Sequence, residues 1–206
     1  SSIPAISANN PAECAVRKPP GDHPGTSIAF DPMTTFTRQD LEAPMPTIDP
    51  AVLTEFATEI FRNTNIPPET AAQVAKSLVL ANLKGHDSHG VIRIIEYVDW
   101  VERGWTNPTG KLEIEREQPC ILILNGNFGF GQVIGREALT LGIAKAKREG
   151  ACILSLRQSG HLGRVGEFAE MAADAGIACF AMTNTHGGGV LVAPHGGCER
   201  RLSANP

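Results

Sequence analysis

The spacing of apolar residues changes once along this chain, near Gly104, and the change limits the folds open to it. Before Gly104, apolar residues recur every three to four positions, which is the period of an amphipathic helix. After Gly104, short apolar runs typical of strands alternate with further helical patterns. This order predicts an α/β (α+β) fold that begins with a helical segment and continues as a mixed α/β region.

Residues that favour helix starts locate the helices that precede Gly104. Asp49 is a good N-cap, Pro50 suits the first helical position, and Pro67 with Pro68 restarts the pattern. The predicted helices therefore span about 49–63, 68–85 and 90–103. On the first and third of them, the residues expected to be buried are Val52, Phe56, Ile60, Phe61, Ile92, Ile95, Val98 and Trp100.

The residues after Gly104 predict strands and helices in alternation. We expect strands over 112–114, 120–124, 151–156 and 177–183, with helices over 132–148 and 163–175. From Thr185 to Pro206 the chain holds five of its 21 glycines and no apolar period, which indicates a loop.

Proline separates an N-terminal arm from the rest of the chain. Nine of the 15 prolines lie in the first fifty residues, among polar residues without an apolar period. Residues 1–46 are therefore predicted to be a flexible arm. A helical domain over 47–108 and an α/β domain over 109–206 should follow it.

Composition and charge exclude several classes of protein. With 42% hydrophobic and 19% charged residues the chain is of ordinary globular composition, and its apolar runs are far shorter than the about 20 residues of a membrane-spanning helix. A net charge of −4 leaves no basic excess for nucleic-acid phosphates. The five cysteines form no CxxC pair, which favours a reducing compartment. We therefore expect a cytoplasmic protein with small-molecule partners and no nucleic-acid or membrane partner.

The densest group of chemically active side chains is His86-Asp87-Ser88-His89, between two predicted helices. A histidine titrates near neutral pH and a neighbouring hydroxyl can fix its tautomer, so this group suits general acid catalysis. Asp87 or Ser88 can equally cap the third helix, which would make the group a structural junction. The two histidines also have a spacing that a metal ion can use, but no third ligand lies nearby and we predict no metal.

A second group, from Ser159 to Gly163, follows a predicted strand and begins a predicted helix. Backbone N–H groups at a helix N-terminus bind anions, and Gly160 and Gly163 would let a phosphate or carboxylate approach. The same residues also suit a plain strand-to-helix turn in which His161 only caps the helix. The residues alone leave both interpretations open.

Two glycine-rich runs imitate known motifs. Gly-Phe-Gly at 129–131, with Gly135, stands between a strand and a helix, but its third glycine is one residue late for the dinucleotide fingerprint G-x-G-x-x-G. His-Gly-Gly-Gly at 186–189 matches the oxyanion loop of some α/β-hydrolases, yet no G-x-S-x-G nucleophile occurs in the sequence. A Rossmann fold and an esterase are therefore weaker hypotheses.

Five segments taken together resemble one known family. They are His86 to Gly90 with Arg93, Gly129 to Val133, Ser159 to Arg164, Val192 to Pro194 with Gly196-Gly197, and Arg201-Leu202 with Asn205-Pro206. In this order they make residues 47–206 resemble the first half of the malate/L-lactate dehydrogenase family, which lacks a Rossmann fold. The resemblance implies a non-Rossmann, L-sulfolactate dehydrogenase-like fold whose mixed-sheet NAD(P)-binding domain is incomplete over 109–206.

The resemblance also implies an oxidoreductase that uses NAD or NADP to interconvert a 2-hydroxy acid and a 2-oxo acid. It makes His89 the proton donor or acceptor and Ser88 its relay partner, puts His161 at the active site, and puts Arg93 beside the anions of substrate and cofactor. A full-length member is expected to be a homodimer. The residues implied to line the cofactor pocket are Leu162, Gly163, Arg164, Val165, Gly166, Asn184, Thr185, Ser203, Ala204 and Asn205.

Two departures from the family allow a second interpretation. Ser203-Ala204 stands where the family usually has Gly-Thr, so a hydroxyl that could bond the cofactor is lost. Family members are also longer than the matched stretch, and the carboxylate that completes the histidine relay is expected beyond Pro206. The alternative is a truncated, non-catalytic family product that at most binds nucleotide or dimerises.

Overall fold

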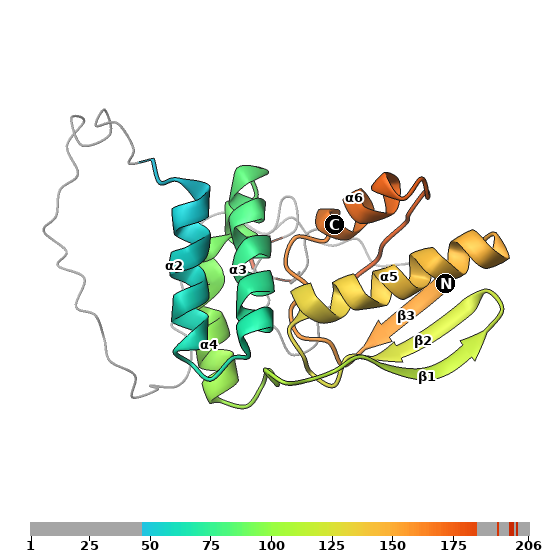
Figure 1. Cartoon of the computed structure of the whole chain (residues 1–206), viewed down its shortest axis with the longest axis horizontal. Coiled ribbons are helices and arrows are strands. Elements are labelled where there is room, and N and C mark those ends of the chain that lie inside the picture. The colour runs from blue at the N-terminus through green and yellow to red at the C-terminus, as the bar shows by residue number, and fades with distance from the viewer. Residues whose placement is uncertain (1–46, 185–192, 194–197, 200, 202–206) are drawn as a thin grey trace, which may run out of the picture. The chain divides into compact units, whose positions relative to one another are not determined.

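The computed structural model describes residues 47–184, 193, 198, 199 and 201 (Figure 1). Residues Pro46–Ala181 form one compact unit, and the described residues from Met182 onward belong to a second unit. The elements are α2 (Pro50–Arg62), α3 (Pro68–Leu83), the 3-10 turns η2 (Asp87–His89) and η3 (Val91–Arg93), α4 (Ile94–Glu102), β1 (Glu113–Gln118), β2 (Ile121–Asn125), α5 (Gly131–Glu149), β3 (Ile153–Arg157) and α6 (Gly166–Asp174). This order confirms the predicted helical segment and the mixed α/β region that follows it. The predicted arm, 1–46, and most of the predicted loop, 185–206, lie outside the described residues.

Helices α2 and α3 begin where the proline and aspartate signals locate them. The Asp49 carboxylate accepts hydrogen bonds from the N–H groups of Ala51 and Val52 at 2.8 and 3.2 Å, which satisfies two of the free donors at the helix start. Pro68 opens α3 in the same position that Pro50 takes in α2. No helix in the described residues is long and apolar enough to span a membrane.

The third predicted helix is shorter than expected, because the 3-10 turn η3 occupies its first residues and follows directly on η2. The turns follow from close packing at Gly90, where a Cβ would collide with the Asn82 side chain. Asn82 accepts a hydrogen bond from the N–H of Val91 at 2.9 Å and donates one to the Asp87 carboxylate at 2.6 Å. These contacts bend the chain sharply, and α4 begins only at Ile94.

The buried faces of α2 and α4 differ from those that the sequence predicts. Ile92 and Ile95 are 72% and 82% exposed, and Val52 and Phe56 are exposed as well. On α4 it is Tyr97 that fills the core. The three-to-four-residue spacing of apolar residues correctly identifies the helices. Helix α2, however, carries two neighbouring apolar stripes, and tertiary packing determines which of them is buried.

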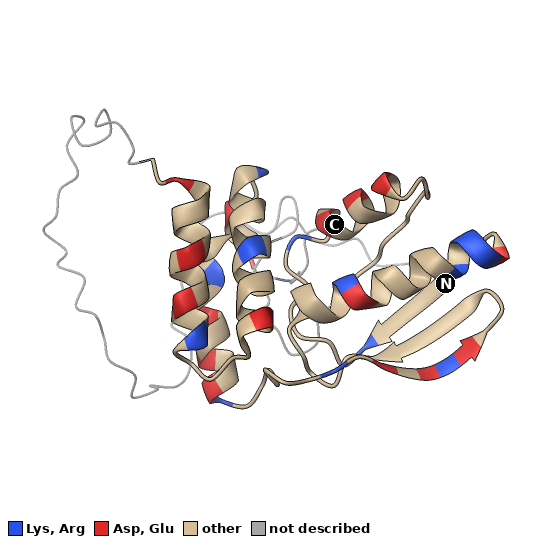
Figure 2. Cartoon of the chain, in the orientation of Figure 1, with Lys and Arg blue, Asp and Glu red and all other residues tan. Residues whose placement is uncertain are grey.

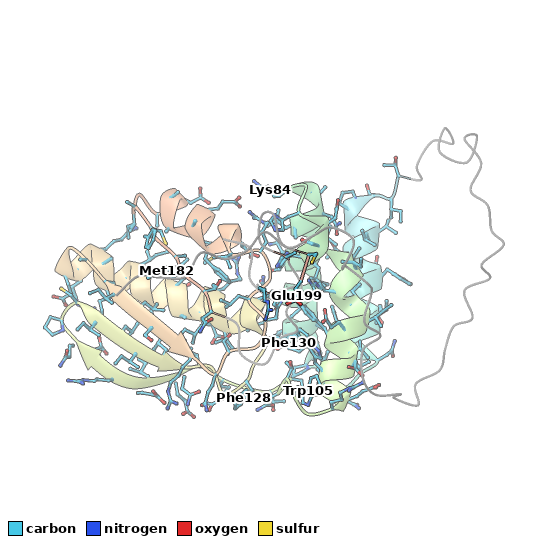
Figure 3. The ribbon with its side chains drawn as sticks, turned by 180° about the vertical axis from the view of Figure 1, so that it is seen from behind. Lys84, Trp105, Phe128, Phe130, Met182 and Glu199 are labelled. Carbon is cyan, nitrogen blue, oxygen red and sulfur yellow. The ribbon has the colours of Figure 1, made fainter. Side chains whose placement is uncertain are left out.

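A common core joins the helical segment to the start of α5. Tyr97 of α4 and Phe130, which directly precedes α5, pack into the same cluster, and Figure 3 shows Phe130 where the helical segment meets α5. The shared core unites the helical segment and the α/β region in a single body. Its buried members are Ala57, Phe61, Ile66, Ala71, Val74, Ala75, Leu78, Tyr97 and Phe130.

The sheet is mixed, with strand order β1-β2-β3. Strand β1 runs antiparallel to β2, and β2 runs parallel to β3. Leu122 and Leu124 of β2 pack with Ala138 of α5, which covers one face of the sheet. Strand β1 is longer than predicted and lies further along the chain, because all of its residues are exposed and mostly charged and so show no apolar period.

The predicted strand at 177–183 is wrong. The described residues there form no strand, and Phe180 and Met182 are exposed. A strand forms only where a neighbouring segment accepts its hydrogen bonds. Among the described residues β3 pairs with β2 alone, so the segment 177–183 has no strand beside it. Apolar composition alone therefore does not make this segment a strand.

Opposite charges join the β1–β2 hairpin to the last turns of α5 (Figure 2). Lys145 Nζ lies 2.6 Å from the carboxylate of Glu117 and donates to the carbonyl oxygens of Gln118 and Pro119 at 2.9 and 3.3 Å. Lys145 is only 3% exposed, and these partners use all three donors of its ammonium group. The buried charge thus fixes the hairpin against α5.

Candidate active site

Two histidines that are far apart in sequence meet where the helical segment joins the α/β region. His89 ends η2, and His161 lies in the loop between β3 and α6. Their rings stack, with centroids 5.2 Å apart and planes inclined by 18°, and the His86 ring lies 4.9 Å from that of His89. We call these three residues the histidine cluster. Across the described stretch of the chain, no group of three or more His, Cys, Asp or Glu residues is arranged to hold a metal ion.

Close backbone packing determines where His161 lies. Helix α5 begins at Gly131, where a Cβ would collide with the carbonyl oxygens of Gly160 and His161. The N–H of Gly160 donates to the carbonyl of Gly129 at 2.8 Å. These glycines let the loop after β3 lie directly on the N-terminus of α5, so the glycine run at 129–135 serves backbone packing.

A chain of hydrogen bonds fixes the position of the proton on His161. Gln132 Nε2 donates to Tyr97 Oη at 2.7 Å, and Tyr97 Oη lies 2.7 Å from His161 Nδ1. The buried hydroxyl of Tyr97 has one hydrogen to donate, and Nδ1 of His161 is the acceptor that the described residues offer it, because Gln132 is a donor to the same oxygen. Tyr97 therefore donates to Nδ1. Nε2 of His161 then carries the imidazole hydrogen and is a hydrogen-bond donor.

This Gln132–Tyr97–His161 chain is enclosed by protein. Gln132 and Tyr97 are each 1% exposed, and the Trp100 ring packs edge-on against His161 with centroids 6.1 Å apart. Burial raises the pKa of the Tyr97 phenol, which therefore stays protonated and able to donate. Gln132 Oε1 is buried without a hydrogen-bond partner among the described residues.

Burial also lowers the pKa of both stacked histidines. The pKa of His161 falls from 6.5 to about 4, mainly because burial disfavours the charged ring, and His89 and Arg93 add repulsion. The pKa of His89 is lowered by burial first, then by His86 and Arg93. Both rings are therefore mainly neutral at neutral pH, and a proton on one disfavours a proton on the other.

A small cavity lies beside the cluster. Its volume is about 280 Å³, and it is lined by Ser88, Ile92, Arg93 and Glu96. Arg93 donates through Nε to the carbonyl of Ser88 at 2.6 Å and pairs with Glu96 at 2.5 Å, while Ser88 Oγ lies 3.0 Å from Nδ1 of His89. The other terminal nitrogen of Arg93 has no partner within the described residues, so it has donors to offer a carboxylate.

The loop from His161 to Gly166 has unused backbone donors. The N–H groups of residues 161–166 reach no acceptor in the described portion of the chain, and Gly163 adopts a left-handed φ of 73°. Arg164 is held by Glu170 at 2.8 and 2.9 Å, while its buried Nε has no described partner. Clustered backbone N–H groups suit an anionic or amide-bearing ligand.

The structure brings four of the predicted site residues together: Ser88, His89, Arg93 and His161. The predicted cofactor residues Leu162 to Gly166 form the loop that leads into α6. Asn184 is exposed and belongs to the second unit. The remaining predicted cofactor residues, Thr185, Ser203, Ala204 and Asn205, lie outside the described residues, as does the hydrolase-like run 186–189.

Sequence reasoning missed Tyr97, Gln132 and Glu96. A signal for Tyr97 was present, because the only tyrosine of the chain stands on a predicted helix whose other candidate core residues are wholly apolar or Trp. Gln132 lies inside the recognised segment 129–133 but carried no assigned role. Glu96 lies one helical turn after Arg93, a spacing at which opposite charges meet.

The acid sensitivity of folding tests the environment of His161. The folded pKa of about 4 lies below the ordinary 6.5, so the unfolded chain takes up this proton first as the pH falls. The neutral ring therefore contributes stability that is fully present above pH 6.5 and is lost as the pH falls to 4. The loss is up to about 3 kcal/mol.

Urea unfolding at each pH from 6.5 to 4 measures this loss. Glutamine does not titrate, so the free energy of unfolding of His161→Gln should fall by up to about 3 kcal/mol less than that of the parent over this range. Equal losses in the two proteins would contradict the assigned burial.

Comparison with known proteins identifies the family. The malate/L-lactate dehydrogenase family matches residues 48–206. A malate dehydrogenase of Pyrococcus abyssi is 42% identical over 154 residues, which are 75% of this chain and 42% of that protein. An L-lactate dehydrogenase of Cupriavidus necator is 34% identical over 152 residues, 74% of this chain and 44% of that protein.

A solved structure gives the same result. The malate dehydrogenase of Pyrococcus horikoshii superposes with a TM-score of 0.61 at 37% identity, over 64% of this chain and 38% of that one. The chain thus spans well under half the length of the relatives that it matches. The family match covers the helical segment, the sheet and both histidines of the stacked pair. The chain belongs to the malate/L-lactate dehydrogenase family.

Proposed function

We propose that this protein is an NAD(P)-dependent oxidoreductase that interconverts 2-hydroxy acids and 2-oxo acids. The observation that carries the proposal is the Gln132–Tyr97–His161 chain, which presents an imidazole N–H beside His89. Relatives named malate and L-lactate dehydrogenases support the substrate class, because both names denote 2-hydroxy acids.

The two stacked histidines have different roles: His161 stabilises negative charge on the substrate oxygen, and His89 transfers the proton. Reduction of a carbonyl builds negative charge on its oxygen, and a neutral imidazole N–H can stabilise that charge. His161 suits this task, because its low pKa keeps it neutral and Tyr97 keeps the hydrogen on Nε2. His89, less buried and bonded to Ser88, gives up a proton from its protonated form, which is the minor form at neutral pH, and takes the proton back in the reverse direction.

Arg93 is suited to hold the substrate carboxylate. Its guanidinium lines the cavity and has free donors, and a planar guanidinium binds a carboxylate through two parallel hydrogen bonds. Glu96 holds the side chain in place and balances some of its charge. The cavity of about 280 Å³ is small enough to favour a short acid.

The loop over 161–166 fits a nicotinamide nucleotide. Its unused N–H groups and the unpartnered Nε of Arg164 are donors that a nucleotide can satisfy, and Gly163 leaves room for close approach. Bound NAD(P)H would supply the hydride. The predicted residues Leu162, Val165 and Gly166 complete this wall of the pocket, and either NAD or NADP is compatible with them.

The family resemblance supports the remaining proposals. The full-length protein is a homodimer that acts on small acids. It is cytoplasmic, in keeping with cysteines that form no CxxC pair, and it binds no nucleic acid, in keeping with a net charge of −4. Light scattering of the purified full-length protein measures the dimer directly, and a monomer at micromolar concentration would contradict it.

Turnover by a hybrid protein tests the proposed activity. In this hybrid, residues 48–206 replace the matching segment of the Pyrococcus abyssi malate dehydrogenase, because this chain spans 42% of that protein. We expect reduction of the 2-oxo acids that correspond to malate, lactate or sulfolactate, followed by loss of NADH or NADPH absorbance. A folded hybrid that oxidises neither nucleotide with any of these acids would contradict the proposal.

Arg93→Lys in the same hybrid tests the carboxylate contact. Lysine keeps the charge but loses the paired donors, so we expect KM for the acid to rise about tenfold or more with a smaller change in kcat. Arg103→Lys is the matched control, because Arg103 caps the other end of α4, is paired with Asp99 and lies outside the cavity. Equal KM values for the two variants would contradict the assigned role.

A further inference from the structure

Two cysteines that are distant in sequence lie side by side at one end of the sheet. Cys120 directly precedes β2 and Cys152 directly precedes β3, and the parallel register pairs Ile121 with Ile153. The N–H of Ile153 donates to the carbonyl of Cys120 at 2.7 Å, so the two backbone segments are still adjacent at the cysteines. Neighbouring strands lie about 4.8 Å apart, within the Cα separation of about 4.4 to 6.8 Å that disulfides span.

The Cys152 thiol faces α5, with the Cys120 thiol nearby. Cys152 packs with Leu154 against the cluster beneath α5, and the Cys120 thiol lies close enough to interact electrostatically with that of Cys152. A Cβ at Gly142 of α5 would lie 3.9 Å from Cys152 Sγ, which shows that this thiol points to α5. Both cysteines are free and partly exposed.

We propose that Cys120 and Cys152 form a redox-sensitive dithiol that hydroperoxides oxidise reversibly to an intrachain disulfide. One thiolate attacks a peroxide oxygen, which breaks the O–O bond and forms a sulfenic acid. The leaving oxygen takes up the proton that the thiol lost and departs as water from hydrogen peroxide, or as an alcohol from an alkyl hydroperoxide. The second sulfur then attacks the sulfenic sulfur, forms the S–S bond and releases water. Two thiols are oxidised by two electrons, and one peroxide is reduced.

The surroundings of the pair favour closure. Cys120 lies in the turn between β1 and β2, and Cys152 lies in the short connection before β3. The ammonium of Lys145 is anchored at Gln118 and Pro119, next to Cys120. Burial raises the pKa of the Cys152 thiol while Lys145 opposes that rise.

The pair lies away from the histidine cluster. It precedes the N-terminal ends of β2 and β3, whereas the loop that carries His161 follows the C-terminal end of β3. Oxidation should therefore leave nucleotide binding unchanged. It should raise the melting temperature by about 5 °C, because the cross-link ties the hairpin to β3 and restricts the unfolded chain.

Peptide mapping of the peroxide-treated full chain tests the proposal. The chain is exposed to stoichiometric hydrogen peroxide, alkylated and digested, and mass spectrometry then locates the modified cysteines. We expect a 120–152 cross-linked peptide lacking two hydrogens, which dithiothreitol reverses and which either Cys120→Ser or Cys152→Ser abolishes. Cys179→Ser is the matched control and should leave the cross-link intact, since Cys179 is exposed and outside the sheet.

Other products would overturn the proposal. These are sulfinic acid at Cys120 and Cys152 separately, cross-links between chains, and alkylation of both thiols after peroxide treatment. Peptide mapping of the native chain does not depend on a variant folding, so each of these results counts against the pair even if a serine variant fails to fold.

Discussion

Replacing His161 by alanine in the hybrid enzyme is expected to lower kcat by about 10²- to 10³-fold, the usual cost of removing one donor to a developing oxyanion. The imidazole N–H that stabilises the carbonyl oxygen is lost, and Tyr97 loses its acceptor. The fold should survive, because the side chain lies in a loop and outside the hydrophobic core cluster. Stopped-flow measurement of NADH oxidation gives kcat directly.

His86→Ala is the matched control for this prediction. His86 belongs to the same cluster, but its ring contacts only that of His89 and makes no hydrogen bond through its side chain among the described residues. Its removal should change kcat only severalfold. If His161→Ala and His86→Ala lowered kcat equally, the role assigned to the Gln132–Tyr97–His161 chain would be wrong.

The second large effect concerns stability. Glu167 at the start of α6 is 5% exposed and accepts hydrogen bonds from Arg136 of α5 at 2.6 Å and from Ser77 of α3 at 3.2 Å. Removing one partner of a buried ion pair leaves the other charge unpaired. Glu167→Ala should therefore lower the free energy of unfolding by about 3 kcal/mol, toward the lower end of such losses because Arg136 is partly exposed.

Glu167→Gln is the matched control for stability. Its amide oxygen can still accept from Ser77 and Arg136, so the network keeps its geometry and loses only charge. The loss should be about half that of the alanine variant. Urea unfolding measures both, and an alanine variant as stable as the parent would show that this network does not hold α6 to the other helices.

The sequence predicts the elements of this fold better than their packing. The proline and Asp49 signals locate α2 and α3 because they act through neighbouring residues. Which face of α4 is buried depends on contacts with other helices. The exposed Ile95 shows that the spacing of apolar residues alone does not predict this face. The segment 177–183 fails as a strand for the same reason, because strand formation needs a neighbour distant in sequence.

The candidate site shows the same division. Ser88 and His89 are adjacent in sequence, and their hydrogen bond could be expected from that adjacency. The stack of His89 on His161 depends on glycine packing between α5 and the loop after β3, and only the family resemblance pointed to it. Tyr97 and Gln132 were missed because their function lies in a hydrogen bond between two elements, which no local pattern records.

Fluorescence titration of the 206-residue chain with NADH and NADPH tests the central claim most directly, because it asks whether the loop beside His161 holds a nicotinamide nucleotide. The account predicts saturable binding that Gly163→Val weakens at least about tenfold and His86→Ala leaves unchanged. A valine at 163 must adopt a left-handed φ of 73° and crowds Gln132, so it distorts the loop that presents the free N–H groups. Absence of saturable binding by a chain whose circular dichroism shows it folded, or binding indifferent to Gly163→Val, would contradict the account.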